Sequence, residues 1–134
     1  MNEEEYEETK NIAIDFDNVI HNSDKGYHDG TIYGEPLEGV EMALKHIQRK
    51  GYNIIVFTCK ANEQRPLIQG KTGNRLVREW LDKYELSQYI TKITDRKPRA
   101  KFYIDDKAIK FKSWEQTLGE IGIVREWITD NYIR

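Results

Sequence analysis

The sequence contains little cysteine and no long apolar run. These two absences argue against disulfide-bonded, cysteine-rich metal-binding and membrane-spanning proteins. Cys59 is the single cysteine among 134 residues, which excludes an internal disulfide and any metal site built from several cysteines. Such cysteine usage favours the reducing cytoplasm. No apolar run approaches the roughly 18 residues of a membrane helix, and the acidic start lacks the apolar core of a signal peptide. We therefore expect a cytoplasmic protein with no membrane contact.

The sequence also lacks an excess of positive charge. Its formal net charge is −2, so the chain as a whole is not expected to attract nucleic acid. Residues 1–10 carry five Glu against one Lys and are expected to form a frayed acidic leader, with residues 11–134 as a single domain. Residues 60–101 carry eleven Lys and Arg against five Asp and Glu. Such a stretch can attract a phosphorylated partner, although most charge runs are solvated surface.

Short apolar runs and helical spacings alternate along the rest of the chain. The runs predict buried strands at residues 12–16, 54–58, 89–93 and 102–104. Apolar residues at helical spacing predict helices over 37–47, 76–84 and 114–133, with Trp80, Trp114 and Trp127 in the core or at its edge. This alternation predicts an α/β, Rossmann-like fold with a mostly parallel sheet and helices on both faces. The segments between the predicted elements leave room for a minimal cap domain or none.

Polar residues follow the predicted strands at the edge where parallel sheets gather their functional groups. Asp15 lies inside an apolar run, where an ionised carboxylate is costly unless it is paired or bound to a metal. Further carboxylates, Asp17, Asp105 and Asp106, follow the first and fourth strands, and Thr58 ends the second. Converging carboxylates repel one another, and a hard cation such as Mg²⁺ removes that repulsion. The pattern therefore predicts a site for Mg²⁺ and phosphate.

A lysine is expected to complete this site. Lys97 follows the third strand and precedes the fourth, so it can return to the edge that carries Asp105. Lys101 is the alternative, but it would begin the fourth strand at the opposite edge. Thr58 and Lys97 are therefore the predicted donors to the phosphoryl oxygens. His21 and His28 lie in a polar segment and could touch substrate, but they are expected to be surface histidines, which usually have no special role.

Several of these motifs together resemble a known family. The run Asp15-Phe16-Asp17-Asn18-Val19, Thr58 after an apolar strand, Lys97, and the pair Asp105-Asp106 occur in the order of the haloacid-dehalogenase-like (HAD) phosphohydrolase superfamily. The stretches PLEGVEMALKHIQRKGYNIIVFTCK and KPRAKFYIDDKAIKF look like small capless members from bacteria and phages. The resemblance covers about residues 11–114. Where many members have glycine after the second aspartate, this chain has Asn18.

The resemblance implies a phosphatase that works through a covalent aspartyl phosphate. It implies that Asp15 is the nucleophile and that Asp17 protonates the leaving oxygen and then activates water. Thr58 and Lys97 would bind the transferring phosphoryl group. Aspartate is a known nucleophile in phosphoryl transfer, and little more than positioning and charge neutralisation is then required.

The resemblance also implies the ligands of the metal. Mg²⁺ would be held by Asp15, the backbone carbonyl of Asp17 and Asp105, with Asp106 assisting. The expected partner is a small phosphorylated substrate, and nucleotides, sugar phosphates and phosphorylated nucleic-acid ends all remain open. Two other functions use similar residues: a receiver-like phosphoacceptor and a phosphate-binding module with little turnover. In receivers the acidic pair comes first in the chain, whereas here it comes last, so the order disfavours a receiver.

Overall fold

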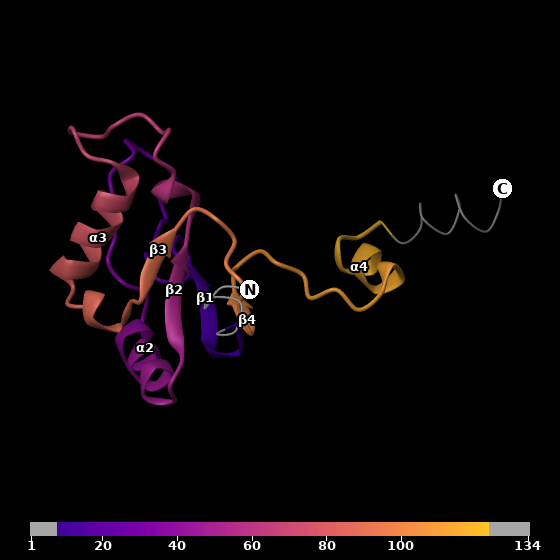
Figure 1. Cartoon of the computed structure of the whole chain (residues 1–134). Helices are drawn as coiled ribbons and strands as arrows, with labels where there is room; N and C mark the ends of the chain where they lie inside the picture. Colours follow the sequence, from indigo (N-terminus) through magenta and orange to yellow (C-terminus); the bar gives the residue numbers. More distant parts are fainter. Residues whose placement is uncertain (1–7, 124–134) are drawn as a thin grey trace.

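A four-stranded parallel sheet forms the centre of the molecule (Figure 1). The computed structural model describes residues 8–123. The strands are β1 (Asn11–Asp15), β2 (Asn53–Phe57), β3 (Lys92–Thr94) and β4 (Phe102–Ile104), in the order β3-β2-β1-β4. The predicted α/β class and the parallel sheet are confirmed. From β1 the next two strands, β2 and β3, are added on one side, and the last strand, β4, is added on the other side. The strand order therefore reverses at β1.

Two amphipathic helices pack on one face of this sheet. They are α2 (Val40–Arg49) and α3 (Gly73–Lys83). Each helix lies within the connection between two neighbouring parallel strands, and both connections run in the same direction across the sheet, which places the helices on the same side. Even-numbered residues of β1 and β2 form one core cluster with them, including Ile14, Val56, Leu44, Val77 and Leu81. This buried contact orients the strands whose ends carry the site.

The opposite face is crossed by an extended segment, residues 95–101, on its way from β3 to β4. The Asn11 side-chain amide donates to the Arg99 carbonyl at 3.0 Å, and the Tyr103 hydroxyl donates to the Pro98 carbonyl at 2.5 Å. Beneath this segment Ala13 and Ile55 are 2% and 7% exposed. Helices were expected on both faces; among residues 8–123 this crossover segment takes the place of the second layer, because only about seven residues join β3 to β4.

Element ends differ from the sequence-based expectation by a few residues. β1 ends at Asp15 and β2 at Phe57, so Phe16 and Thr58 lie just beyond their strands. The third strand begins later than predicted, because Ser87–Tyr89 forms a 3₁₀ turn. Tyr89 is nevertheless buried, since it packs into the core from that turn. A run of apolar residues indicates that the segment is buried, but it does not distinguish a strand from a tightly packed turn.

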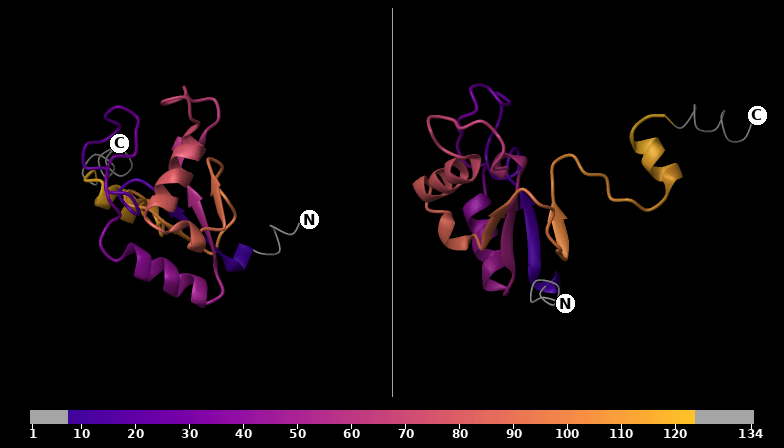
Figure 2. Two further views of the ribbon diagram at one scale, coloured as in Figure 1. Left: turned by 90° about the vertical axis from the view of Figure 1, so that its left-hand side faces the viewer. Right: turned by 45° about the horizontal axis from the view of Figure 1, so that its top comes forward.

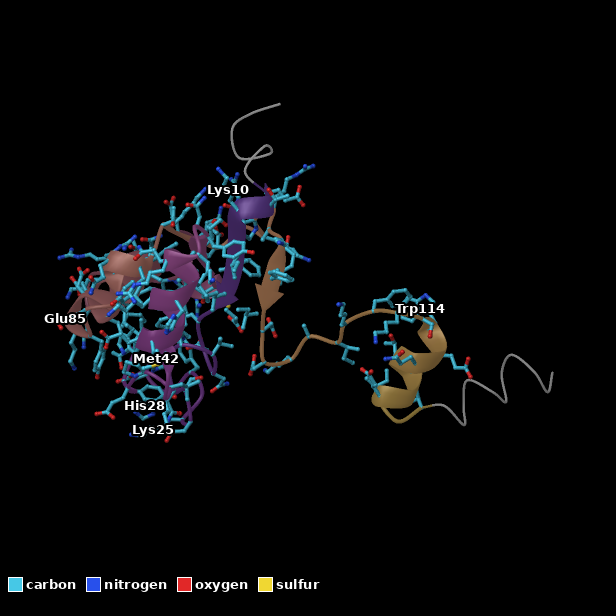
Figure 3. All side chains as sticks on the ribbon, turned by 90° about the horizontal axis from the view of Figure 1, so that it is seen from below. Lys10, Lys25, His28, Met42, Glu85 and Trp114 are labelled. Atoms are coloured by element: carbon cyan, nitrogen blue, oxygen red, sulfur yellow. The ribbon has the colours of Figure 1, made fainter. Side chains whose placement is uncertain are left out.

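The C-terminal part of the described chain stands apart from the sheet. Helix α4 (Trp114–Glu120) follows an extended segment and lies away from the sheet (Figures 1 and 3). Trp114 is 65% exposed, so its predicted place in the core is wrong, whereas Trp80 is buried as predicted. The helical spacing of apolar residues predicts a helix, but it does not show whether that helix packs against the core of the domain. Trp127, most of the predicted 114–133 helix beyond α4, and residues 1–7 of the acidic leader lie outside the described residues.

The last residues of the predicted leader are folded against the domain. Glu8–Lys10 forms a 3₁₀ turn, and the Glu8 carboxylate lies 3.6 Å from the Arg99 guanidinium. These last residues of the leader thus contact the domain in the structure. Within residues 8–123, none of the helices has the length and apolar character that a membrane crossing requires.

Candidate active site

Three carboxylates meet at the carboxyl edge of the sheet. Asp15 is the last residue of β1, and Asp105 and Asp106 follow β4, its hydrogen-bonded neighbour. One carboxylate oxygen from each residue lies within 4.8 Å of the others. Asp105 Oδ1 also accepts hydrogen bonds from the backbone N–H groups of Lys107 at 2.6 Å and Ala108 at 3.1 Å, which hold its carboxylate in place. The expected convergence of positions 15, 105 and 106 is therefore present.

The neighbouring charges and partial burial make ionisation of Asp15 costly. Burial raises the pKa of this carboxyl, the Phe16 backbone N–H opposes the shift with a 2.8 Å hydrogen bond, and repulsion from Asp105, Asp106 and Asp17 adds to the rise. The resulting pKa is about 6. An oxygen-only cluster that resists carrying its charges fits a hard divalent cation, since the cation removes both the repulsion and the desolvation cost.

A pH-dependent response to Mg²⁺ is expected from this cluster. The folded pKa of Asp15, about 6, lies above its ordinary value of 3.8, so without metal the folded protein loses stability as pH rises through that window. Mg²⁺ competes with the proton. We expect Mg²⁺ to raise the thermal unfolding midpoint at about pH 7.5 and to lose that effect below about pH 5. Potassium chloride at matched ionic strength is the control, and an equal response to both salts would contradict a specific site.

Asp17 lies beside this cluster but its carboxylate has different partners. Its Oδ1 lies 2.9 Å from His21 Nδ1, and its Oδ2 lies 3.3 Å from Lys60 Nζ. Burial raises the pKa of Asp17, but the His21 hydrogen bond and the Lys60 ammonium outweigh it, so the net pKa is below the ordinary value. Its side chain is not a member of the carboxylate cluster.

His21 is a buried residue of the site, and the expectation that it lies at the surface is wrong. It is 1% exposed and stacks on Phe16 with ring centroids 5.4 Å apart. The Gly34 backbone N–H donates to its Nε2 at 2.9 Å. Nε2 is therefore an acceptor, so the proton resides on Nδ1 and is donated to Asp17. His21 thus fixes the orientation of the Asp17 carboxylate.

Thr58 lies at the same edge, directly after β2. It is 4% exposed, and its backbone N–H donates to the Thr94 carbonyl at 2.9 Å. Its Oγ1 accepts from the Lys60 backbone N–H at 3.2 Å and caps the short turn η2 (Cys59–Ala61). The hydroxyl proton remains available to donate to a phosphoryl oxygen. The same turn directs Lys60 toward Asp17, so one local structure positions two groups of the site.

The two candidate lysines lie at different places on the sheet. The Lys101 backbone N–H donates to the Asn11 carbonyl, and its Nζ lies 3.4 Å from the Tyr52 hydroxyl, which places it at the amino edge. Lys97 Nζ lies 4.8 Å from the centroid of the Tyr103 ring. Tyr103 pairs with Ala13, and Asp15 follows two residues later on the same face. Of the two lysines, Lys97 therefore shares the face of Asp15.

Two loops extend beyond the carboxyl ends of β1 and β2, and neither forms a separate domain within the described chain. They are residues 21–35 and residues 62–72 (Figure 2). Lys25 and His28 lie together in the first loop (Figure 3). The expectation of a minimal cap thus agrees with the structure of residues 8–123. Comparison of the chain with family models, with curated proteins and with solved structures finds no match.

Proposed function

We propose that this protein is a Mg²⁺-dependent phosphatase that hydrolyses a phosphomonoester through an aspartyl phosphate on Asp15. The observation that carries the proposal is the meeting of the Asp15, Asp105 and Asp106 carboxylates within 4.8 Å, at the strand where the sheet reverses its order. Ligands of parallel α/β sheets bind at such reversal points. The resemblance of the motifs to the HAD superfamily supports the same proposal.

The donor set suits magnesium. Asp15, Asp105 and Asp106 supply only oxygen ligands, and Mg²⁺ needs few direct carboxylates because it retains several waters. When bound, Mg²⁺ supplies positive charge that neutralises the carboxylates and the phosphoryl oxygens. Thr58 and Lys97 donate to those oxygens as well, which favours a bound phosphate at this edge.

The chain's own residues account for the two halves of the reaction. A carboxylate oxygen of Asp15 bonds to phosphorus as the phosphorus–ester oxygen bond breaks, and the leaving oxygen takes a proton from Asp17. Asp17 then takes a proton from the water that hydrolyses the aspartyl phosphate, which releases inorganic phosphate and frees Asp15. Although the pKa of Asp17 is below its ordinary value, a bound phosphate adds negative charge nearby and favours its protonated form.

Hydrolysis of a substrate panel tests the proposal. The panel holds an aryl phosphate, nucleotides, sugar phosphates and oligonucleotides with 3′- or 5′-phosphate ends. We expect phosphate release with Mg²⁺, loss of release with a chelator and recovery when Mg²⁺ is restored. A lasting phosphoaspartate without turnover would point instead to a receiver-like phosphoacceptor. Binding of phosphorylated ligands without any phosphate release would point to a binding module.

A further inference from the structure

Exposed apolar side chains gather in the last part of the described chain. Residues 8–123 expose eleven large apolar side chains, and eight of them lie between residues 102 and 123. Three of the eight are in β4, and five are in the segment that follows it, here called the C-terminal arm (residues 107–123). The five are Ile109, Phe111, Trp114, Ile121 and Ile123. Apolar surface gathered in this way usually marks a contact with another surface.

The first uncovered surface is the side of β4 that faces the helices. Phe102 pairs with Ile12 in the parallel register, and paired residues point to the same face of a sheet. Ile104 pairs with Ile14 in the same way. Ile12 and Ile14 are buried in the core cluster with α2 and α3, whereas Phe102 and Ile104 are 52% and 41% exposed. The two helices contact β2 and β3, and their layer leaves β4 uncovered (Figure 1).

The second uncovered surface is the apolar side of α4. Trp114, Leu118 and Ile121 follow one another at helical spacing, so they share one side of this helix and of the residue after it. Trp114 is 65% and Ile121 is 53% exposed. The Phe111 ring packs against Trp114 with ring centroids 5.2 Å apart and extends the same surface. α4 thus has the apolar side of a helix that covers a sheet, and its largest side chains remain exposed.

The connection between the two surfaces keeps them apart within one copy. Asp105 Oδ1 accepts hydrogen bonds from the backbone N–H groups of Lys107 and Ala108, which fixes the direction in which the chain leaves β4. Residues 107–113 then run without helix or strand and can span up to about 23 Å. α4 consequently lies away from its own sheet (Figures 1 and 2). An arm of this length can reach a neighbouring molecule.

We propose that α4 of one copy packs on β4 of a second copy, and that the exchange is reciprocal, so that two copies form a closed dimer. Each copy carries one uncovered β4 and one uncovered α4, so reciprocal exchange covers every such surface and leaves none over. Exchange of an identical element between two copies is a low-cost route to a dimer. The exchange also covers an apolar edge strand, which otherwise promotes aggregation. It does not depend on the phosphatase chemistry proposed above.

The apolar area available is enough for a stable dimer. Seven of the eight side chains can be buried by the exchange, because Tyr103 alternates with its neighbours and points to the other face of the sheet. The seven are between 39% and 65% exposed. At roughly 80 Å² for each half-exposed side chain, two copies together would bury on the order of 1,100 Å². A specific interface needs about 1,000 Å².

Charged substitutions on the two surfaces test the exchange. Trp114→Glu alters the arm and Phe102→Lys alters β4, where an edge strand tolerates lysine. Met42→Glu is the matched control, since Met42 is 66% exposed but lies in α2, outside both surfaces. Sedimentation velocity over a range of protein concentrations gives the dimer dissociation constant. We expect a dimer of the unsubstituted protein, a rise of at least about thirtyfold in that constant for Trp114→Glu and Phe102→Lys, and less than about threefold for Met42→Glu.

A mixture of the two variants distinguishes exchange from other dimers. The Phe102→Lys copy still offers an intact arm, and the Trp114→Glu copy still offers an intact β4. We therefore expect the mixture to form a mixed dimer under conditions where each variant alone is a monomer. One contact in that dimer is unaltered, and the other pairs the new lysine with the new glutamate. Circular dichroism checks that both variants are folded.

Each other outcome would overturn the exchange. A protein that stays monomeric at every concentration has no such dimer. Loss of the dimer in Trp114→Glu alone would indicate contact between two arms, and loss in Phe102→Lys alone would indicate pairing of two β4 edges. A mixture that stays monomeric would exclude contact between the arm and β4. A sample of isotope-labelled and unlabelled unsubstituted protein provides a check without substitution, because NMR contacts between Trp114 and β4 of the other copy should appear, and their absence would contradict the proposal.

Discussion

Replacement of Asp15 by asparagine is expected to abolish phosphate release while making the metal-free protein more stable. The amide cannot form the aspartyl phosphate, so kcat should fall by about a thousandfold or more, the range seen when a nucleophile is removed. Stability should change in the opposite sense. The folded pKa of Asp15, about 6, lies above its ordinary value of 3.8, so at neutral pH the folded state pays for ionising this carboxyl and asparagine removes that cost.

The two effects are measured together on the same variant. Steady-state hydrolysis gives kcat, and chemical unfolding with a chelator present gives the free energy of unfolding. Asp95→Asn is the matched control, because Asp95 is exposed and follows β3 at the same edge but is not a member of the carboxylate cluster. It should keep both kcat and stability. An Asp15→Asn protein that still turns over would rule out the covalent route, and one that is destabilised would indicate a purely structural carboxylate.

The meeting of Asp15 with Asp105 and Asp106 could be predicted from the sequence because it depends only on topology. Short apolar runs predict strands, and the carboxyl ends of parallel strands meet at one edge. No knowledge of side-chain packing is needed for that step. The choice between Lys97 and Lys101 also depended on topology. The hydrogen bond from the Lys101 backbone N–H to the Asn11 carbonyl places Lys101 at the amino edge of the sheet.

The partners of Asp17 could not be predicted in that way, because they depend on how loops close. His21 lies in a polar stretch, and polar stretches are usually exposed, yet the loop folds so that this ring stacks on Phe16. Its position four residues after Asp17 was the available signal, but such a spacing is informative only within a known turn. Lys60 is brought to Asp17 by the η2 turn that Thr58 caps. Periodicity detects helices and strands but not such short turns.

The exposure of Trp114 has a similar cause. Apolar residues at helical spacing predict α4, and the Ser113 hydroxyl caps it by accepting from the Gln116 backbone N–H. Nothing local to that pattern specifies which surface the helix covers. An extended segment separates α4 from the sheet, and β4 is itself exposed, with Phe102, Tyr103 and Ile104 each more than 40% accessible. Local sequence thus predicts the helix but not its packing.

Removal of the Lys97 ammonium is expected to give the second large loss of activity. Lys97→Met keeps most of the side-chain volume but removes the charge that would stabilise the transferring phosphoryl group. Loss of one such donor typically lowers kcat by about a hundredfold to a thousandfold. Lys97 is exposed, and its contact with the Tyr103 ring is worth at most about 1 kcal/mol, so the fold should be little affected. Steady-state kinetics with the best substrate of the panel measures the effect, with circular dichroism as a check on folding.

Lys101→Met is the matched control for this loss, because it removes the same charge from the amino edge of the sheet, away from the carboxylates. It should change kcat less than about twofold, since at about 0.15 M salt exposed charges beyond roughly 8 Å are largely screened. Equal losses in the two variants would mean that the general charge of this region, rather than one ammonium, assists the reaction. Full activity in Lys97→Met would show that Lys97 does not assist phosphoryl transfer. The Lys60 ammonium, 3.3 Å from Asp17 Oδ2, would then be the cation nearest the chemistry, and Lys60→Met should carry the loss instead.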